Sequence, residues 1–260
     1  MKKQKIAILT VSVALITSIV AVKKISSNTS ELRKNDFTLP EGFTVTAHTG
    51  CEGERDNTLE SIRAGAQAGA DIVEIDLHFL SDGTPVLCHD TPKETKISEE
   101  MPSLESAFLL LSKLDVKMNV DVKSTANLSA VAELSDKSGV TGKIFFTGVE
   151  EKDVEAVKSA TPDIPYYLNV SVEKKKNTDA EYLKTLVDKV KNCGAIGINM
   201  NFKHCSEELV EAFRGEGLLV SVWTANSKRD MLKSLSLSPD NITTRKPSML
   251  KVTAIEPNES

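Results

Sequence analysis

The sequence predicts one parallel α/β domain, a (β/α)8 barrel of the TIM type, over residues 42–250. Eight short runs rich in β-branched residues alternate with helical stretches, and no boundary or internal repeat interrupts them. Strands that alternate with helices build a parallel sheet, and eight parallel strands close into a barrel. Such barrels commonly need about 200–250 residues, which the predicted domain provides.

Each expected strand is a short apolar run bounded by polar or turn residues. The strands are Thr44–Thr49, Ile72–Phe79, Lys117–Lys123, Lys143–Gly148, Tyr166–Val170, Ala195–Asn201, Leu218–Thr224 and Asn241–Thr244. An additional strand, Pro85–Cys88, follows the turn at Asp82 and Gly83.

The expected helices carry apolar residues at three- and four-residue spacing. They are Leu59–Ala70, Leu104–Leu114, Ala126–Ser138, Glu151–Ala160, Ala180–Asn192, Ser206–Arg214 and Lys228–Ser234. Asn57 is expected to be the N-cap of the first helix, with Glu60 three residues later as its capping-box partner.

Residues 1–24 are expected to be a membrane anchor or signal segment. Lysines flank an uncharged stretch of 17 residues, Ile6–Val22, which is at the short end of what spans a bilayer. Because no A-x-A-like site precedes the second lysine pair, we expect an uncleaved transmembrane or signal-anchor helix. The domain would then be extracytoplasmic, or secreted if the segment is cleaved. Residues 25–41 are expected to be a polar linker and residues 251–260 a C-terminal tail.

The charge balance excludes a nucleic-acid partner. The net charge of −5 becomes −10 for residues 25–260 once the five lysines of the first 24 residues are set aside. A phosphate backbone calls for a basic surface instead. The four cysteines show no C-x-x-C spacing for zinc. Free thiols are expected, with a bridge between Cys51 and Cys88 as the alternative.

Two predicted strands present acidic side chains on one face. Glu74 and Asp76 lie two residues apart, and Asp121 and Lys123 have the same spacing. Adjacent anions repel each other unless a cation lies between them, and oxygen ligands suit Mg²⁺ or Ca²⁺. The pattern predicts a divalent-cation site of three carboxylates, with Lys123 neutralising a phosphate or balancing the acids. Solvated acids and a surface Asp–Lys pair are the simpler alternatives.

Two of the four histidines, His48 and His89, end β-rich runs. An imidazole titrates near neutral pH, so a pair facing a phosphodiester could act as general base and general acid. His78 lies on the same face of the predicted strand as Glu74 and Asp76 but two residues beyond Asp76, so we expect it to have a structural role. His204 precedes a helix and has no evident partner.

Short segments at the predicted strand ends follow one another in a fixed order from His48 to Pro247. They read A-H-T-G, D-N-T-L-E-S, G-A-D-I-V-E-I-D-L, D-G-T-P-V-L-C-H-D, N-V-D-V-K, V-W-T-A-N and I-T-T-R-K-P. In this order they resemble the glycerophosphodiester phosphodiesterases. The resemblance implies site roles. By this resemblance, the metal ligands of the family correspond to Glu74, Asp76 and Asp121, and its acid–base pair corresponds to His48 and His89. Lys123 corresponds to the lysine that contacts the phosphate, and Trp223 corresponds to an aromatic residue that lines the substrate pocket.

The chain departs from the family pattern at three positions. Asp121 stands where the family usually has Glu, and Asp56 replaces the Glu before Asn-Thr. Thr49 replaces the arginine of His-Arg-Gly, so it is expected beside the substrate phosphate without the two-pronged grip of an arginine. These departures indicate a divergent member with an altered substrate grip.

The resemblance implies a metal-dependent phosphodiester hydrolase. It would cleave a small phosphodiester or lipid head group to glycerol 3-phosphate and an alcohol, with one Mg²⁺ or Ca²⁺ and two histidines. Three alternatives stay open. They are a phospholipid-cleaving relative that forms a cyclic phosphate, a catalytically weakened barrel that binds metal or phosphate, and an unrelated metal-dependent barrel hydrolase.

Overall fold

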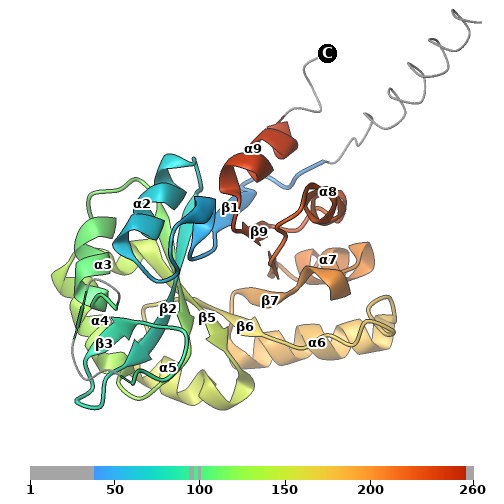
Figure 1. The fold of residues 1–260 in the computed structure, drawn as a ribbon. Coiled ribbons are helices and arrows are strands. Elements are labelled where there is room, and N and C mark those ends of the chain that lie inside the picture. Colours follow the sequence, from blue (N-terminus) through green and yellow to red (C-terminus); the bar gives the residue numbers. More distant parts are fainter. Residues whose placement is uncertain (1–37, 94–96, 99–100, 256–260) are drawn as a thin grey trace, which may run out of the picture. The chain divides into compact units, whose positions relative to one another are not determined.

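The computed structural model describes residues 38–93, 97, 98 and 101–255, which form a barrel surrounded by helices (Figure 1). The strands are β1 Thr44–Ala47, β2 Ile72–Phe79, β3 Pro85–Leu87, β4 Lys117–Val122, β5 Ile144–Val149, β6 Tyr166–Asn169, β7 Gly197–Asn201, β8 Leu219–Trp223 and β9 Asn241–Thr244. All pair in parallel except β3, which lies antiparallel on the edge of β2. β1 pairs with both β2 and β9, so the eight parallel strands close into the predicted TIM-type barrel.

Helices follow most strands and pack on the outside of the barrel. The α-helices are α2 Leu59–Gln67, α3 Leu104–Leu111, α4 Leu128–Lys137, α5 Val154–Ala160, α6 Ala180–Cys193, α7 Glu207–Arg214, α8 Lys228–Ser236 and α9 Pro247–Ile255. Short 3-10 turns occupy Cys51–Gly53, Thr141–Lys143, Glu151–Asp153 and Phe202–His204. Helix α9 has no counterpart in the sequence prediction, and it continues past residue 250, where the tail was expected to begin.

The predicted cap of α2 is wrong by one residue. Thr58 is the N-cap, and its side chain accepts a hydrogen bond from the backbone N–H of Ser61. Asn57 instead has a φ of 58°, and its side chain bonds to β2. Glu60 pairs with Arg63 on the exposed side of the helix. Asn57, which the sequence suggests as the cap, therefore bonds to a strand of the barrel instead of to the helix.

The two faces of β2 show how the core is divided. Ile75 and Leu77 are fully buried in the apolar layer between strands and helices, where apolar burial stabilises the fold. The alternate residues Glu74 and Asp76 are buried too, but they point into the barrel. A period-2 strand in a closed barrel thus separates packing residues from site residues.

Polar side chains inside the barrel bond to one another across strands. Thr46 donates to Asn241 at 2.8 Å, and Thr147 donates to Asn119 at 2.9 Å. Asn119 and Asn241 are nearly inaccessible to solvent. These pairs satisfy buried donors and acceptors inside the barrel, and Thr147 and Asn119 also line the cavity described below.

The predicted membrane segment, residues 1–24, lies outside the described residues. Within the part of the chain that the structure describes, no helix combines the length and apolar character needed to cross a bilayer. The structure contains no disulfide between Cys51 and Cys88, so the alternative of a bridge between them is wrong.

Candidate active site

A cavity of about 730 Å³ opens where the parallel strands end. Seven of the eight predicted site residues line it, and Thr49 does not. The seven are His48, Glu74, Asp76, His89, Asp121, Lys123 and Trp223. The C-terminal ends of barrel strands therefore collect the groups that the sequence distributes over 176 positions, from residue 48 to residue 223.

Glu74, Asp76 and Asp121 form an acidic centre on β2 and β4. Each offers a carboxylate oxygen, and these oxygens lie within 4.8 Å of one another. The strand register explains this proximity, because Asp76 stands opposite Asp121 in the β2–β4 pair. Burial, and then the charges of Asp76 and Asp121, raise the pKa of Glu74 well above its usual value.

Lys123 offsets part of this negative charge. Its Nζ lies 2.8 Å from Asp121 Oδ2 and 3.1 Å from Asp76 Oδ1. Burial disfavours the ammonium, but the two carboxylates outweigh that effect and raise the pKa of Lys123. One ammonium against three carboxylates leaves an excess of negative charge when all are ionised.

The acidic centre fits a divalent cation. Asp121 Oδ1 is buried and has no hydrogen-bond partner among the described residues. A buried carboxylate oxygen without a donor is costly unless a cation satisfies it. Together with the surplus charge, this oxygen indicates a site for a hard cation with oxygen ligands.

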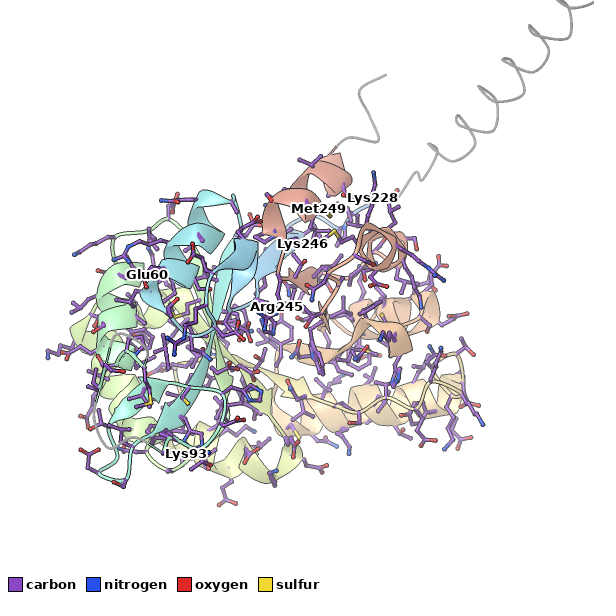
Figure 2. The ribbon with its side chains drawn as sticks, viewed as in Figure 1. Glu60, Lys93, Lys228, Arg245, Lys246 and Met249 are labelled. Carbon is purple, nitrogen blue, oxygen red and sulfur yellow. The ribbon has the colours of Figure 1, made fainter. Side chains whose placement is uncertain are left out.

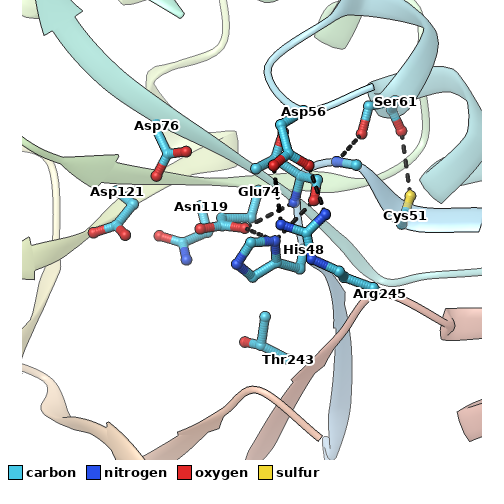
Figure 3. Close-up of polar contacts among 12 residues, drawn as sticks. His48, Cys51, Asp56, Ser61, Glu74, Asp76, Asn119, Asp121, Thr243 and Arg245 are labelled. Carbon is cyan, nitrogen blue, oxygen red and sulfur yellow. Dashed lines mark hydrogen bonds and ion pairs between the residues drawn. The ribbon is translucent and has the colours of Figure 1, made fainter. Parts of the chain in front are cut away.

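His48 follows β1 and lies beside the acidic centre (Figure 3). Its Nδ1 is 2.8 Å from the carbonyl oxygen of Thr49 and 3.6 Å from Glu74 Oε2. Because a carbonyl oxygen only accepts, Nδ1 carries the hydrogen, which leaves Nε2 of the neutral ring as an acceptor. Burial lowers the pKa of His48, and the bond to Thr49 opposes this effect only in part.

His89 lines the same cavity from the loop after β3. Its Nδ1 lies 2.8 Å from Asp90 Oδ1, so the carboxylate orients the ring and fixes the hydrogen on Nδ1. His89 is mostly exposed, unlike His48. Two imidazoles in different surroundings therefore face one cavity. Trp223, the residue expected to line the substrate pocket, is partly exposed on its wall.

Thr49 differs from its predicted place beside the substrate. Its side chain is buried and accepts a hydrogen bond from the backbone N–H of Asn57 at 2.5 Å. The Thr49 backbone N–H donates to Glu74 Oε2 at 2.9 Å. Thr49 thus holds the loop through its side chain and orients Glu74 through its backbone N–H. Its short side chain is used by the bond to Asn57 and does not reach the cavity.

Sequence reasoning missed two contributors to the site. The Asn57 amide donates to Asp76 Oδ2 at 2.8 Å, so it holds the middle acid. Arg245, directly after β9, lines the cavity and forms two hydrogen bonds with Asp56. The signal for Arg245 was its place at a strand end, where His48 and Lys123 also stand.

Comparison with known proteins decides the family. The model of the glycerophosphoryl diester phosphodiesterase family matches residues 48–99 and 93–249, which is more than half of the chain. The chain belongs to this family. It is therefore an enzyme of the phosphoric diester hydrolase class.

One curated relative aligns over most of this chain and another over less than half of it. A glycerophosphodiester phosphodiesterase from Caldanaerobacter subterraneus subsp. tengcongensis is 24% identical over 251 residues, covering 79% of this chain and 95% of that protein. Human glycerophosphodiester phosphodiesterase 1 is 33% identical over 126 residues, covering 45% and 37%.

Solved structures share the fold. A phosphodiesterase from Oleispira antarctica, in complex with the product sn-glycerol-3-phosphate, superposes with a TM-score of 0.68 at 20% identity and covers 83% of this chain and 96% of its own. A second solved structure, from Galdieria sulphuraria, gives a TM-score of 0.67 at 21% identity and covers 84% of this chain and 98% of its own.

Proposed function

We propose that this family member hydrolyses glycerophosphodiesters to glycerol 3-phosphate and an alcohol with the help of one divalent cation. The observation that carries the proposal is the acidic centre with its unpartnered Asp121 oxygen, in one cavity with two imidazoles. The names of the curated relatives support the substrate class.

Glu74, Asp76 and Asp121 would hold the cation, which is Mg²⁺ or Ca²⁺ because all three donors are carboxylate oxygens. When bound, the ion supplies positive charge that polarises the phosphoryl oxygens. The Thr49 N–H donates to Glu74 Oε2 and the Asn57 amide donates to Asp76 Oδ2, so these bonds fix the orientation of the two carboxylates.

His48 is the proposed general base. With its hydrogen on Nδ1, Nε2 takes the proton of the attacking hydroxyl, which comes from water or from the glycerol of the substrate. His89 is the proposed general acid, oriented by Asp90, and it protonates the leaving alkoxide. Its exposed position at the cavity edge suits the side where the leaving alcohol departs.

Lys123 and Trp223 complete the proposed site. Lys123 offsets negative charge on the phosphoryl oxygens from its place between Asp76 and Asp121. Trp223 offers an apolar surface on the cavity wall against which the carbon atoms of the substrate pack.

Hydrolysis of glycerophosphocholine with Mg²⁺ or Ca²⁺ tests the proposal. We expect release of equal amounts of glycerol 3-phosphate and choline, and loss of both products in a chelating buffer. Phosphorus NMR of the same reaction separates the routes, because a lasting cyclic phosphate would indicate internal attack. Binding of either ion without turnover of any phosphodiester would instead support the weakened, binding-only barrel.

The N-terminal segment is proposed to anchor the domain to a membrane, with the domain on the extracytoplasmic side. The support is the uncharged stretch of 17 residues between lysines. Fractionation of cells expressing the full chain tests this point. Recovery of the full chain in the membrane fraction, and of a chain lacking residues 1–24 in the soluble fraction, is expected.

A further inference from the structure

The positively charged side chains that line the cavity differ in whether they have hydrogen-bond donors left for a ligand. Among the described lining residues they are Lys123, Lys152 and Arg245. Lys123 is held by two acids of the acidic centre. Lys152 is 74% exposed and pairs with Glu150 at 2.7 Å, as a solvated surface pair does. Arg245 combines a partly buried position with hydrogen-bond donors in reserve.

The Arg245 backbone is fixed at both of its polar groups. Its N–H donates to Asn226 Oδ1 at 2.8 Å, and its carbonyl accepts from the N–H of Glu52 at 2.9 Å. Glu52 also accepts from the N–H and hydroxyl of Ser248, at 3.0 and 2.7 Å. The loop after β1 and the loop after β9 are therefore tied together at the base of this side chain.

The Arg245 guanidinium is fixed as well. Nη1 lies 2.6 Å from Asp56 Oδ1 and Nη2 lies 3.0 Å from Asp56 Oδ2, a two-pronged pair. This bond lowers the pKa of Asp56, so the carboxylate stays charged and keeps its hold. A guanidinium has five N–H donors, of which this pair uses two, so three remain for an anion.

The neighbouring loop is built around this pair. Gly50 has a φ of 71°, and a Cβ there would lie 1.7 Å from Asp56 Oδ1 and 2.5 Å from Arg245 Nη1. A side chain at this position would displace the pair. The loop backbone therefore approaches the Arg245–Asp56 pair as closely as a residue without a side chain allows.

The pair lies on the side of the cavity next to the reacting groups. Figure 3 shows the Arg245 guanidinium between the Asp56 carboxylate and the His48 ring. The charge of Arg245 also lowers the pKa of His48, as expected for a cation facing that ring. In Figure 2, Arg245 lies over the barrel, whereas Lys246 lies beside α9. Successive residues thus serve the cavity and the outer surface.

We propose that Arg245, held by Asp56, binds a non-bridging phosphate oxygen of the substrate. This proposal rests on the proposed phosphodiester hydrolysis and adds a residue that acts on the same site. Thr49 cannot perform this role, because its side chain is buried and bonded to Asn57. Arg245 touches the substrate, and Asp56 acts as its positioning residue.

Substitution of Arg245 tests the proposal. Arg245→Gln removes the charge and the fork, and we expect kcat/KM for glycerophosphocholine to fall about 100-fold, as for the loss of one charged donor at the reacting group. Arg245→Lys keeps the charge without the fork and should recover part of that loss. The matched control is Lys246→Gln, one residue further on the exposed surface, which should keep kcat/KM within about twofold.

Binding of inorganic phosphate gives a readout that does not require turnover. We expect Arg245→Gln to weaken phosphate binding by about 10-fold or more in calorimetry, while its melting temperature stays near that of the Lys246→Gln control. Unchanged phosphate affinity in Arg245→Gln would overturn the proposal. If the unsubstituted enzyme fails to cleave glycerophosphocholine, the proposed substrate is wrong, and the phosphate titration still decides the role of Arg245.

Discussion

The acidic centre and the Arg245–Asp56 pair hold charged groups in different ways. The acids of the centre stand on neighbouring strands, where the β2–β4 register places Asp76 opposite Asp121. The pair joins two loops whose residues are 189 positions apart in the chain. Glu74 and Asp76 are buried and Asp121 is mostly buried, whereas Asp56 is half exposed. The strands therefore hold the charges proposed to bind the cation, while the loops hold the pair proposed to bind the substrate phosphate.

Substitution of Glu74 is the most severe way to break the acidic centre. Glu74→Gln removes one carboxylate and should lower kcat by about 10³-fold or more, since a catalytic cation contributes several kcal/mol. Affinity for Mg²⁺ or Ca²⁺, measured by calorimetry, should fall with it. The control is His78→Asn on the same strand, whose ring bonds to the backbone of Phe79. Equal loss in both variants would contradict a specific role for Glu74.

A change of leaving group distinguishes the proposed roles of the two histidines. His89→Gln should lower kcat for glycerophosphocholine about 10²-fold, because the alkoxide then leaves without its proton. A p-nitrophenyl phosphodiester needs no such proton, so the loss should be much smaller with that substrate. His48→Gln should stay impaired with both substrates. A similar pattern for both variants would contradict the assignment of acid and base.

Cation binding should stabilise the folded protein, and the pH dependence of this stabilisation follows from the pKa of Glu74. In the cation-free protein the raised pKa of Glu74 favours the folded state below the unfolded value of about 4.5. That contribution is lost as pH rises toward the folded pKa. A cation at 100 times its Kd should stabilise the folded state by about 2–3 kcal/mol. At one fixed cation concentration the stabilisation should be larger at higher pH, because Glu74 must lose its proton to bind and the Kd falls as it does so. Scanning calorimetry at pH 5 and pH 8 checks this, and an ion-independent melting temperature would count against the site.

The smallest expected effect comes from the positioning residue of the pair. Asp56→Asn keeps the size of the side chain but loses its charge, so Arg245 should remain nearby in a less fixed orientation. We expect KM for glycerophosphocholine to rise about 5-fold while kcat changes less than twofold, on the scale of one half-exposed ion pair. Arg63→Gln, which breaks the exposed pair with Glu60, serves as control. A fall in kcat without a change in KM would indicate a role for Asp56 in the chemical step instead.

Local patterns in the sequence were sufficient for the barrel and for the acids. Strand periodicity put Glu74 and Asp76 on one face, and the alternation of strands and helices placed their strand in a closed barrel. The same logic located His48 and His89 at strand ends. These predictions succeed because they depend on spacings of a few residues and on one rule of barrel topology.

Contacts between distant loops needed the tertiary structure. Asn57 reads as a helix cap, yet its left-handed backbone turns the side chain onto Asp76. Thr49 reads as a substrate contact, yet it holds its own loop.

The sequence by itself determined the barrel, its family resemblance and the acidic centre. Only the tertiary structure decided that Arg245 meets Asp56 beside His48, because closure of the barrel between β1 and β9 brings together the two ends of the domain. Side-chain periodicity fixes which face of a strand a residue occupies. It does not fix where the loops beyond the strand ends meet, since that depends on packing summed over the whole domain.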